Sequence, residues 1–144
     1  MKAKLIHEAD EKTFALIFDK GDEVMAGLLS FAQEQKLTAS HFTAIGAFER
    51  ATLGYFDRAQ KDYEKIRIDE QVEVLSLIGD IATDDDGGPK VHAHVVVGKR
   101  DGTAHGGHLL EAHVWPTLEV ILTESPEHLR RQMDEKVGLA LIRL

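Results

Sequence analysis

Cysteine is absent from this chain of 144 residues, proline occurs three times, and aromatic residues make up only 6%. Without thiols the protein can form neither a disulfide nor a thiolate zinc site, so a transition-metal site must use imidazole and carboxylate ligands. No run of about 18 apolar residues occurs, and the N-terminus lacks the apolar stretch of a signal peptide. We therefore expect a cytoplasmic protein with no membrane partner.

Length and composition fit one domain, spanning residues 1–144. Hydrophobic residues make up 43% of the chain, enough for a substantial core without disulfides or an obligate structural metal. The 25 acidic and 17 basic residues give a formal charge of −8. This charge opposes nonspecific attraction to a polyanion, so composition disfavours nucleic acid as a partner.

Two helices are predicted among many short strands. Val24, Leu28 and Phe31 recur at helical spacing, so we expect a helix over residues 23–36 with Asp22 as its cap. Ser125 followed by Pro126 predicts a second helix running to about residue 135. Apolar alternation or continuous apolar runs predict strands at residues 2–8, 12–19, 39–48, 51–57, 63–69, 71–82, 91–97, 117–123 and 137–144. The expected class is α+β, a mostly antiparallel sheet with two main flanking helices.

The most informative pattern is a group of histidines. His92 and His94 lie two apart in a β-branched run, so a strand would point both imidazoles to one face. An Asp101-Gly102 turn separates this run from Gly106-Gly107-His108. A hairpin at this turn could bring His108 beside the other two, which suggests a metal site.

The register of that hairpin decides the geometry. If residues 100–102 form a three-residue loop with Gly102 in the left-handed conformation, Lys99 pairs with Thr103 and His94 lies opposite His108. Cβ atoms of directly opposed residues lie roughly 4.5–5.5 Å apart, and such neighbours can share one ion with Zn–N distances of about 2.0–2.1 Å. The predicted ligands of zinc, or of another divalent transition metal, are His92, His94 and His108.

Other registers remain open. A two-residue turn would pair His94 with Leu109 and send His108 to the other face, and a bulge at Gly106-Gly107 would restore it. Glycine within a strand marks either such a bulge or a close approach of ligand or backbone. In the three-residue register His105, Glu111 and His113 face away from the trio and are reserve candidates.

Carboxylates near the motifs have several readings. Glu49 and Glu111 are candidates for a fourth metal ligand or a general base, but a solvated surface carboxylate is the favoured interpretation for each. Three consecutive aspartates at residues 84–86 read as a solvated turn, because an EF-hand needs a longer loop that ends in a bidentate Glu.

Several motifs together resemble one protein family. In chain order they are Ile45–Glu49, Leu53–Asp57, Val74–Gly79, His92–His94, Asp101-Gly102, Gly106–Leu110 and Thr117–Val120. This series resembles the PPC family, the "plants and prokaryotes conserved" domain also called DUF296, whose prokaryotic members are often labelled PD1-like DNA-binding proteins. The resemblance covers nearly the whole chain.

The resemblance implies a seven-stranded antiparallel sheet with flanking helices, assembled as a homotrimer. It also implies that His92, His94 and His108 hold a zinc-like metal. Plant members join the domain to AT-hook segments, and this chain contains no Arg-Gly-Arg-Pro core.

Three classes of function follow. The favoured one is a trimeric module that binds a metal and a small-molecule or anionic ligand, with catalysis left open; three neutral imidazoles would leave one position on zinc for a water whose pKa falls to about 7. A DNA-binding protein without an AT-hook is the alternative. A cupin-like metalloenzyme would need a Glu three or four residues after His-x-His, where this chain has Val97 and Gly98.

Overall fold

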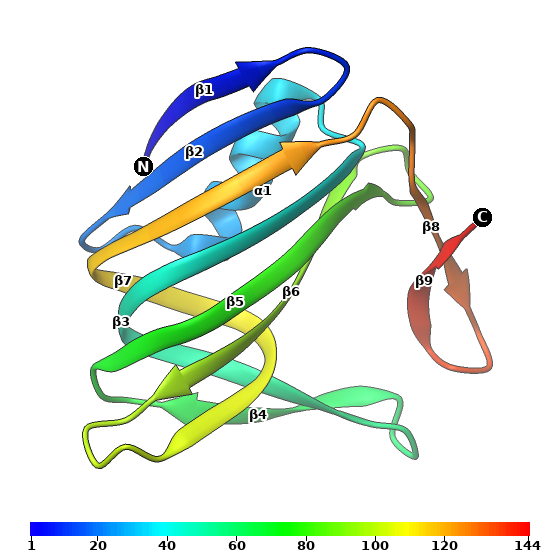
Figure 1. The fold of residues 1–144 in the computed structure, drawn as a ribbon. Coiled ribbons are helices and arrows are strands. Elements are labelled where there is room, and N and C mark those ends of the chain that lie inside the picture. The colour runs from blue at the N-terminus through cyan, green and yellow to red at the C-terminus, as the bar shows by residue number, and fades with distance from the viewer.

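The computed structural model describes residues 1–144 and consists of one nine-stranded sheet with a single helix (Figure 1). The sheet order is β1-β2-β7-β3-β5-β8-β9, with β4 paired to β3 and β6 paired to both β5 and β7. The elements are β1 (Lys2–Glu8), β2 (Lys12–Asp19), α1 (Val24–Gln35), β3 (Ala39–Asp57), β4 (Asp62–Ile68), β5 (Val72–Thr83), β6 (Pro89–Gly98), β7 (Ala104–Glu124), β8 (Arg130–Asp134) and β9 (Leu139–Arg143).

Two long, bent strands form the spine of the sheet. The predicted strands 39–48 and 51–57 are the two halves of β3. The strand that contains His108 continues through the predicted strand 117–123, and the two together form β7. These two strands pair along most of their length with several register shifts. Gly46 has φ +151°, and a Cβ there would lie 2.3 Å from the carbonyl oxygen of Thr117. Glycine therefore permits the close approach of the two strands at this bend.

The hydrophobic core lies between the sheet and α1. A cluster of 27 buried residues includes Leu28 and Phe31 of the helix, and the Phe31 ring meets Phe14 edge to face with centroids 5.2 Å apart. On β6 the buried residues are Ala93, Val95 and Val97, so strand alternation turns the histidines of β6 to the side away from the core. The single helix has 12 residues and does not reach the combination of length and hydropathy that a membrane-spanning helix needs.

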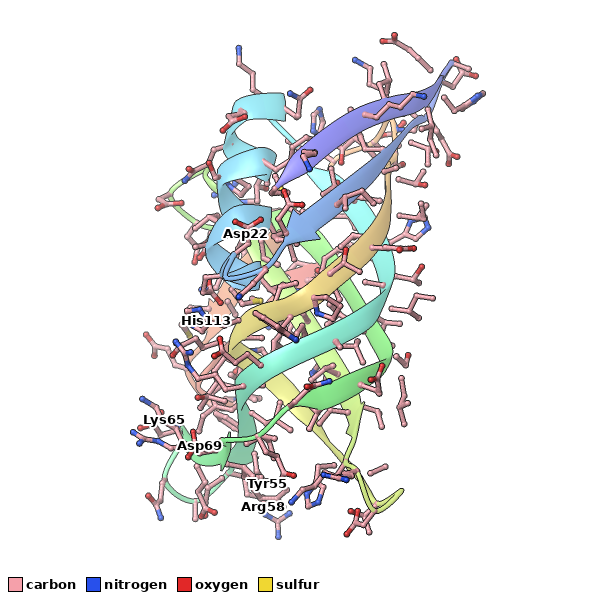
Figure 2. All side chains as sticks on the ribbon, turned by 90° about the vertical axis from the view of Figure 1, so that its left-hand side faces the viewer. Asp22, Tyr55, Arg58, Lys65, Asp69 and His113 are labelled. Carbon is pink, nitrogen blue, oxygen red and sulfur yellow. The ribbon has the colours of Figure 1, made fainter.

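The cap of α1 differs from the prediction. Glu23 is the N-cap, and its carboxylate accepts hydrogen bonds from the backbone N–H groups of Met25 and Ala26. Asp22 instead accepts from the backbone N–H of Asp19 and pairs with the N-terminal amine at 2.6 Å, beside the start of α1 (Figure 2). Sequence spacing alone cannot choose between two adjacent carboxylates that can both reach helix N–H groups.

The predicted second helix is wrong. Ser125 accepts only a local hydrogen bond from the Glu127 N–H, at 3.4 Å, and the following residues form the β8–β9 hairpin, whose turn includes Gly138 at φ +83°. This hairpin extends from the edge of the sheet, joined to β5 by one parallel pair between Thr83 and Arg130 (Figure 1). The side chain of Arg131 reaches Asp80 on β5, a distant contact that local capping signals cannot foresee.

The expected fold class therefore needs correction. An α+β fold with about seven antiparallel strands and two main helices was predicted, whereas the sheet has nine strands, is mixed, and carries one short helix. β8 takes the place of the expected second helix, whereas β9 lies within the strand predicted at residues 137–144 and confirms it.

Candidate metal centre

The β6–β7 hairpin has the predicted three-residue register. The N–H of Lys99 donates to the Thr103 carbonyl at 2.8 Å, and the N–H of Gly102 donates to the Lys99 carbonyl at 2.9 Å. Gly102 has φ +82°, the left-handed conformation that this loop requires. His94 consequently pairs with His108 across the two strands, and the alternative two-residue turn is wrong.

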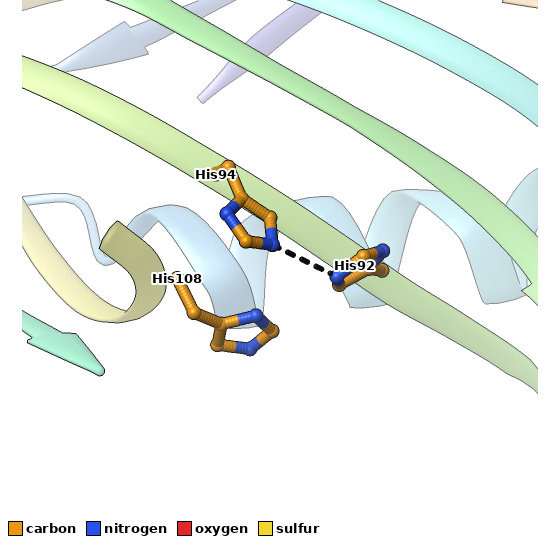
Figure 3. A group of neighbouring side chains, drawn as sticks. All are labelled: His92, His94 and His108. Atoms are coloured by element: carbon orange, nitrogen blue, oxygen red, sulfur yellow. Dashed lines mark hydrogen bonds between the residues drawn. The ribbon is translucent and has the colours of Figure 1, made fainter. Parts of the chain in front are cut away.

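The hairpin brings three imidazoles together. One ligand atom from each of His92, His94 and His108 lies within 4.8 Å of the others. The Nε2 atoms of His92 and His94 are 3.2 Å apart, and the three rings surround a common space (Figure 3). The Nδ1 atom of His108 is buried and has no hydrogen-bond partner.

This arrangement fits a transition metal. Imidazole nitrogens are common ligands of zinc and its neighbours in the first transition series. A buried ring nitrogen without a partner costs free energy, and a metal at the centre of the trio would satisfy it. Both the donor set and the unpaired His108 nitrogen therefore suit a bound cation.

Asp80 and Arg131 contact the Nδ1 side of the His92 ring. Asp80 on β5 lies opposite His92 on β6, and its Oδ2 is 3.3 Å from His92 Nδ1. Its other oxygen accepts from Arg131 Nη2 at 2.5 Å, and Arg131 Nη1 donates to the Ala140 carbonyl at 3.1 Å. Arg131 Nη2 is also 3.2 Å from His92 Nδ1. Metal ligation through His92 Nε2 selects the tautomer whose Nδ1–H donates to Asp80, the usual support for a ligating histidine.

The electrostatic environment keeps the ligands in usable protonation states. Burial, together with charge on His92 and His94, lowers the pKa of His108 to about 4. Burial and the neighbouring His92 also lower the pKa of His94. Burial alone would raise the pKa of Asp80, but hydrogen bonds from His92 and Arg131 outweigh it and the pKa is lowered. At neutral pH His94 and His108 are therefore neutral and Asp80 is a carboxylate.

Tyr63 is a further neighbour that the sequence analysis missed. Its ring stacks on His108 with centroids 4.6 Å apart and an angle of 29° between the planes. A Cβ on Gly54 would lie 2.7 Å from the Tyr63 ring, so glycine at this position leaves room for the stack. Burial raises the pKa of Tyr63, which keeps its hydroxyl protonated.

A cavity of about 310 Å³ adjoins the trio. Its walls include Tyr63, His92 and His108 on strands β4, β6 and β7, and Arg131, Met133 and residues 139–141 on the β8–β9 hairpin. A metal held by the three histidines would therefore border a space large enough for a small ligand.

The reserve candidates lie elsewhere. His105 pairs with Val97 and is exposed, and Glu49 forms a surface pair with Arg50 at 3.5 Å. Glu111 Oε1 lies 3.0 Å from His113 Nε2 and is not part of the histidine trio. Leu110 is an extra residue of β7 between Leu109 and Glu111, which pair with successive residues of β3. This irregularity points the Glu111 side chain away from the core, to the same face of the sheet as His108.

The glycines and aspartates of this region have structural roles. Gly106 and Gly107 pair regularly with Val96 and Val95, so the considered bulge is absent there. A Cβ on Gly107 would lie 2.9 Å from the Gly54 carbonyl oxygen, so close backbone approach explains this glycine. The aspartate loop is a turn, in which Asp84 pairs with Lys90 and Asp86 accepts from the N–H of Gly88.

Several proteins of known structure share this fold. A metal-containing protein from Archaeoglobus fulgidus is 38% identical with a TM-score of 0.83, covering 92% of this chain and 94% of that one. A plant- and prokaryote-conserved (PPC) protein from Pyrococcus horikoshii is 30% identical with a TM-score of 0.85, covering 99% and 95%. A protein from Ralstonia eutropha JMP134, whose name proposes that it binds DNA, is 28% identical with a TM-score of 0.84, covering 91% and 90%.

Sequence comparisons match one curated protein and one family model. The bifunctional protein GlmU of Synechococcus sp. (strain JA-3-3Ab) is 32% identical over 121 residues. The match covers 82% of this chain but only 18% of that protein, so the chain spans about a fifth of its relative. The family model of the Plants and Prokaryotes Conserved (PCC) domain matches residues 6–126. This match covers most of the chain and agrees with the shared fold, and the chain therefore belongs to the PCC domain family.

Proposed function

We propose that this protein binds a divalent transition metal, zinc in the first instance, through His92, His94 and His108. The observation that carries the proposal is the convergence of three imidazoles around a buried His108 nitrogen that has no other partner. The similar protein from Archaeoglobus fulgidus is described as metal-containing, which supports the same reading.

The site suits binding or activation of a ligand. A divalent metal with three histidine ligands has an open position and supplies Lewis-acid chemistry there. The chain itself holds the imidazoles in place: Asp80 orients His92, and Tyr63 stacks on His108. Residues of the β8–β9 hairpin line one side of the adjoining cavity.

Metal analysis tests this proposal. The protein purified without added metal should contain close to one equivalent of metal per chain. Replacing His92, His94 and His108 together by alanine should remove it. His105→Ala is the matched control, because it deletes an imidazole from the same hairpin outside the trio. Equal metal content in the triple variant and the control would refute the proposal.

We also propose that the chain assembles as a homotrimer through the exposed face of its sheet. Ile45, Leu75, Ile78 and Ile121 are between 48% and 62% exposed and lie on the adjacent strands β3, β5 and β7. Exposed apolar side chains on neighbouring strands of one sheet face favour an interaction site there. Ile78 is the cross-strand neighbour of His94, so this face borders the metal site.

Native mass measurement tests the assembly. The trimer should have about three times the mass of the 16.0 kDa chain. Ile121→Glu should release monomers because it places a charge in the apolar face, whereas Ile6→Glu changes an exposed isoleucine on the edge strand β1 and should leave the mass unchanged. A monomeric wild-type protein would overturn this proposal.

DNA binding is the second candidate, favoured by the name of the Ralstonia eutropha protein. Basic side chains such as Arg58 and Lys65 project from the β3–β4 region, but acidic groups such as Asp69 stand among them (Figure 2). Binding that rests on phosphate contacts should weaken steeply with salt. A duplex titration at low and moderate salt checks this, and no binding at low salt dismisses it.

A further inference from the structure

The cavity beside the histidines has two chemically different sides. His92, His108 and Arg131 form a polar side, and Met133, Leu139 and Leu141 form an apolar side contributed by the β8–β9 hairpin. Met133 is 56% exposed although its side chain is apolar. An apolar side chain left open beside a polar pocket suits contact with the apolar part of a ligand.

The polar side of the cavity would favour an anionic ligand once a metal is bound. Imidazole binds a metal as a neutral donor, so three histidine ligands would not offset the two charges of a divalent metal. The carboxylate of Asp80, which contacts His92, is engaged through both oxygens, one with His92 and the other with Arg131. No carboxylate belongs to the cluster of ligand atoms. An anionic fourth ligand must therefore come from outside this chain's own side chains.

Arg131 contributes no uncompensated charge of its own to the site. The residue is only 7% exposed, and its Nε atom is buried without a hydrogen-bond partner. Its charge is balanced by Asp80, which keeps the pair neutral as a unit. At the rim, Lys90 pairs with Asp84. The uncompensated charge of the loaded site is thus the charge of the metal, and a single negative group suits it better than a neutral or cationic one.

We propose that the cavity binds a small monocarboxylate with a short apolar body. The carboxylate takes the open position of the metal, and the apolar body lies against Met133, Leu139 and Leu141. This inference rests on the proposed metal site and adds the chemical class of its ligand.

Cobalt(II) provides a direct readout, because its visible spectrum changes with its ligands. The protein is loaded with one equivalent of Co²⁺ and titrated with acetate, hexanoate and hexanamide. Both carboxylates should change the spectrum and the amide should not. Hexanoate should bind about tenfold more tightly than acetate if its chain buries roughly 60 Å² of additional apolar area.

Two variants of the hairpin test the apolar side. Met133→Glu places a negative charge in the cavity wall and should abolish the preference for hexanoate. Gln132→Glu makes the same change of charge at the adjacent, exposed residue outside the cavity and should bind hexanoate like the wild type. Both variants should retain the wild-type content of cobalt, since neither residue belongs to the histidine cluster.

The outcomes separate the two proposals. If the wild-type protein fails to take up cobalt, the metal site itself is refuted. If cobalt binds but no carboxylate changes its spectrum, the metal proposal stands and the ligand class is wrong. If acetate and hexanoate bind equally, or if Met133→Glu and Gln132→Glu behave alike, the apolar wall has no role and this inference is overturned.

Discussion

The pair formed by Asp80 and Arg131 should stabilise both the fold and the metal site. Arg131 is 7% exposed, so Asp80→Asn would leave a buried guanidinium without its counter-charge. Removing one partner of a buried pair costs about 3–5 kcal/mol. Since Asp80 is 29% exposed, we expect the lower end, about 3 kcal/mol.

A double-mutant cycle isolates this effect. Urea denaturation of the metal-free protein should show a large loss for Asp80→Asn and recovery of most of it when Arg131→Met is added, because the second change removes the uncompensated charge. Asp134→Asn is the control; its partner Arg143 is about half exposed, so the loss of stability should be much smaller than for Asp80→Asn. Equal losses in Asp80→Asn and Asp134→Asn would refute the reasoning.

The same variant should weaken the metal site. Asp80→Asn removes the carboxylate that faces His92 Nδ1, and loss of such an outer partner lowers metal affinity by about 10–100-fold. Competition against a chelating indicator measures this change. An affinity within about twofold of the wild type would show that Asp80 does not orient the ligand.

Three more predictions follow from the structure. Because burial lowers the pKa of His108 to about 4 in the folded protein, the unfolded chain binds more protons than the folded one between about pH 4 and 6.5. The free energy of unfolding should therefore fall by about 2 kcal/mol as the pH drops through this window, after discounting for the partial exposure of His108. Urea melts measure this pH profile, and His108→Leu should flatten it. Gly46→Ala should lower the melting temperature far more than Gly21→Ala, because a Cβ at Gly46 would lie 2.3 Å from the Thr117 carbonyl oxygen. Gly21 also has a positive φ, but a Cβ there would meet no atom within 4 Å, so equal shifts in the two variants would contradict this explanation. Leu122→Ala should cost about 2–5 kcal/mol in urea unfolding, since Leu122 is fully buried, and a loss below about 1 kcal/mol would be inconsistent with that burial.

The histidine hairpin was predictable because its determinants are local. Gly102 requires a left-handed conformation, this fixes the three-residue loop, and strand alternation then places His94 opposite His108. Each step involves residues close in the chain. The register was one of several that the sequence allowed, and the structure selects it.

The supporting residues were not predictable in the same way. Asp80 meets His92 only because β5 and β6 pair in one register, and Arg131 reaches both from a hairpin that lies 51 residues beyond Asp80 and 39 beyond His92. The signals at Ser125 and Pro126 indicated a helix in this region, and the packing of Arg131 against Asp80 and the Ala140 carbonyl favours a strand instead. Tertiary contacts outweighed a local preference.

The position of the site within the sheet links its two proposed properties. His94 lies between Ile78 on β5 and His108 on β7, so one cross-strand row runs from the exposed apolar face into the histidine trio. The opposite edge of the trio meets the cavity walled by the β8–β9 hairpin. Assembly through the apolar face would therefore restrict solvent access to the metal from one side while the cavity stays open to a ligand from the other. For this reason a variant that separates the subunits, such as Ile121→Glu, should alter how tightly the metal is held even though Ile121 is not one of its ligands.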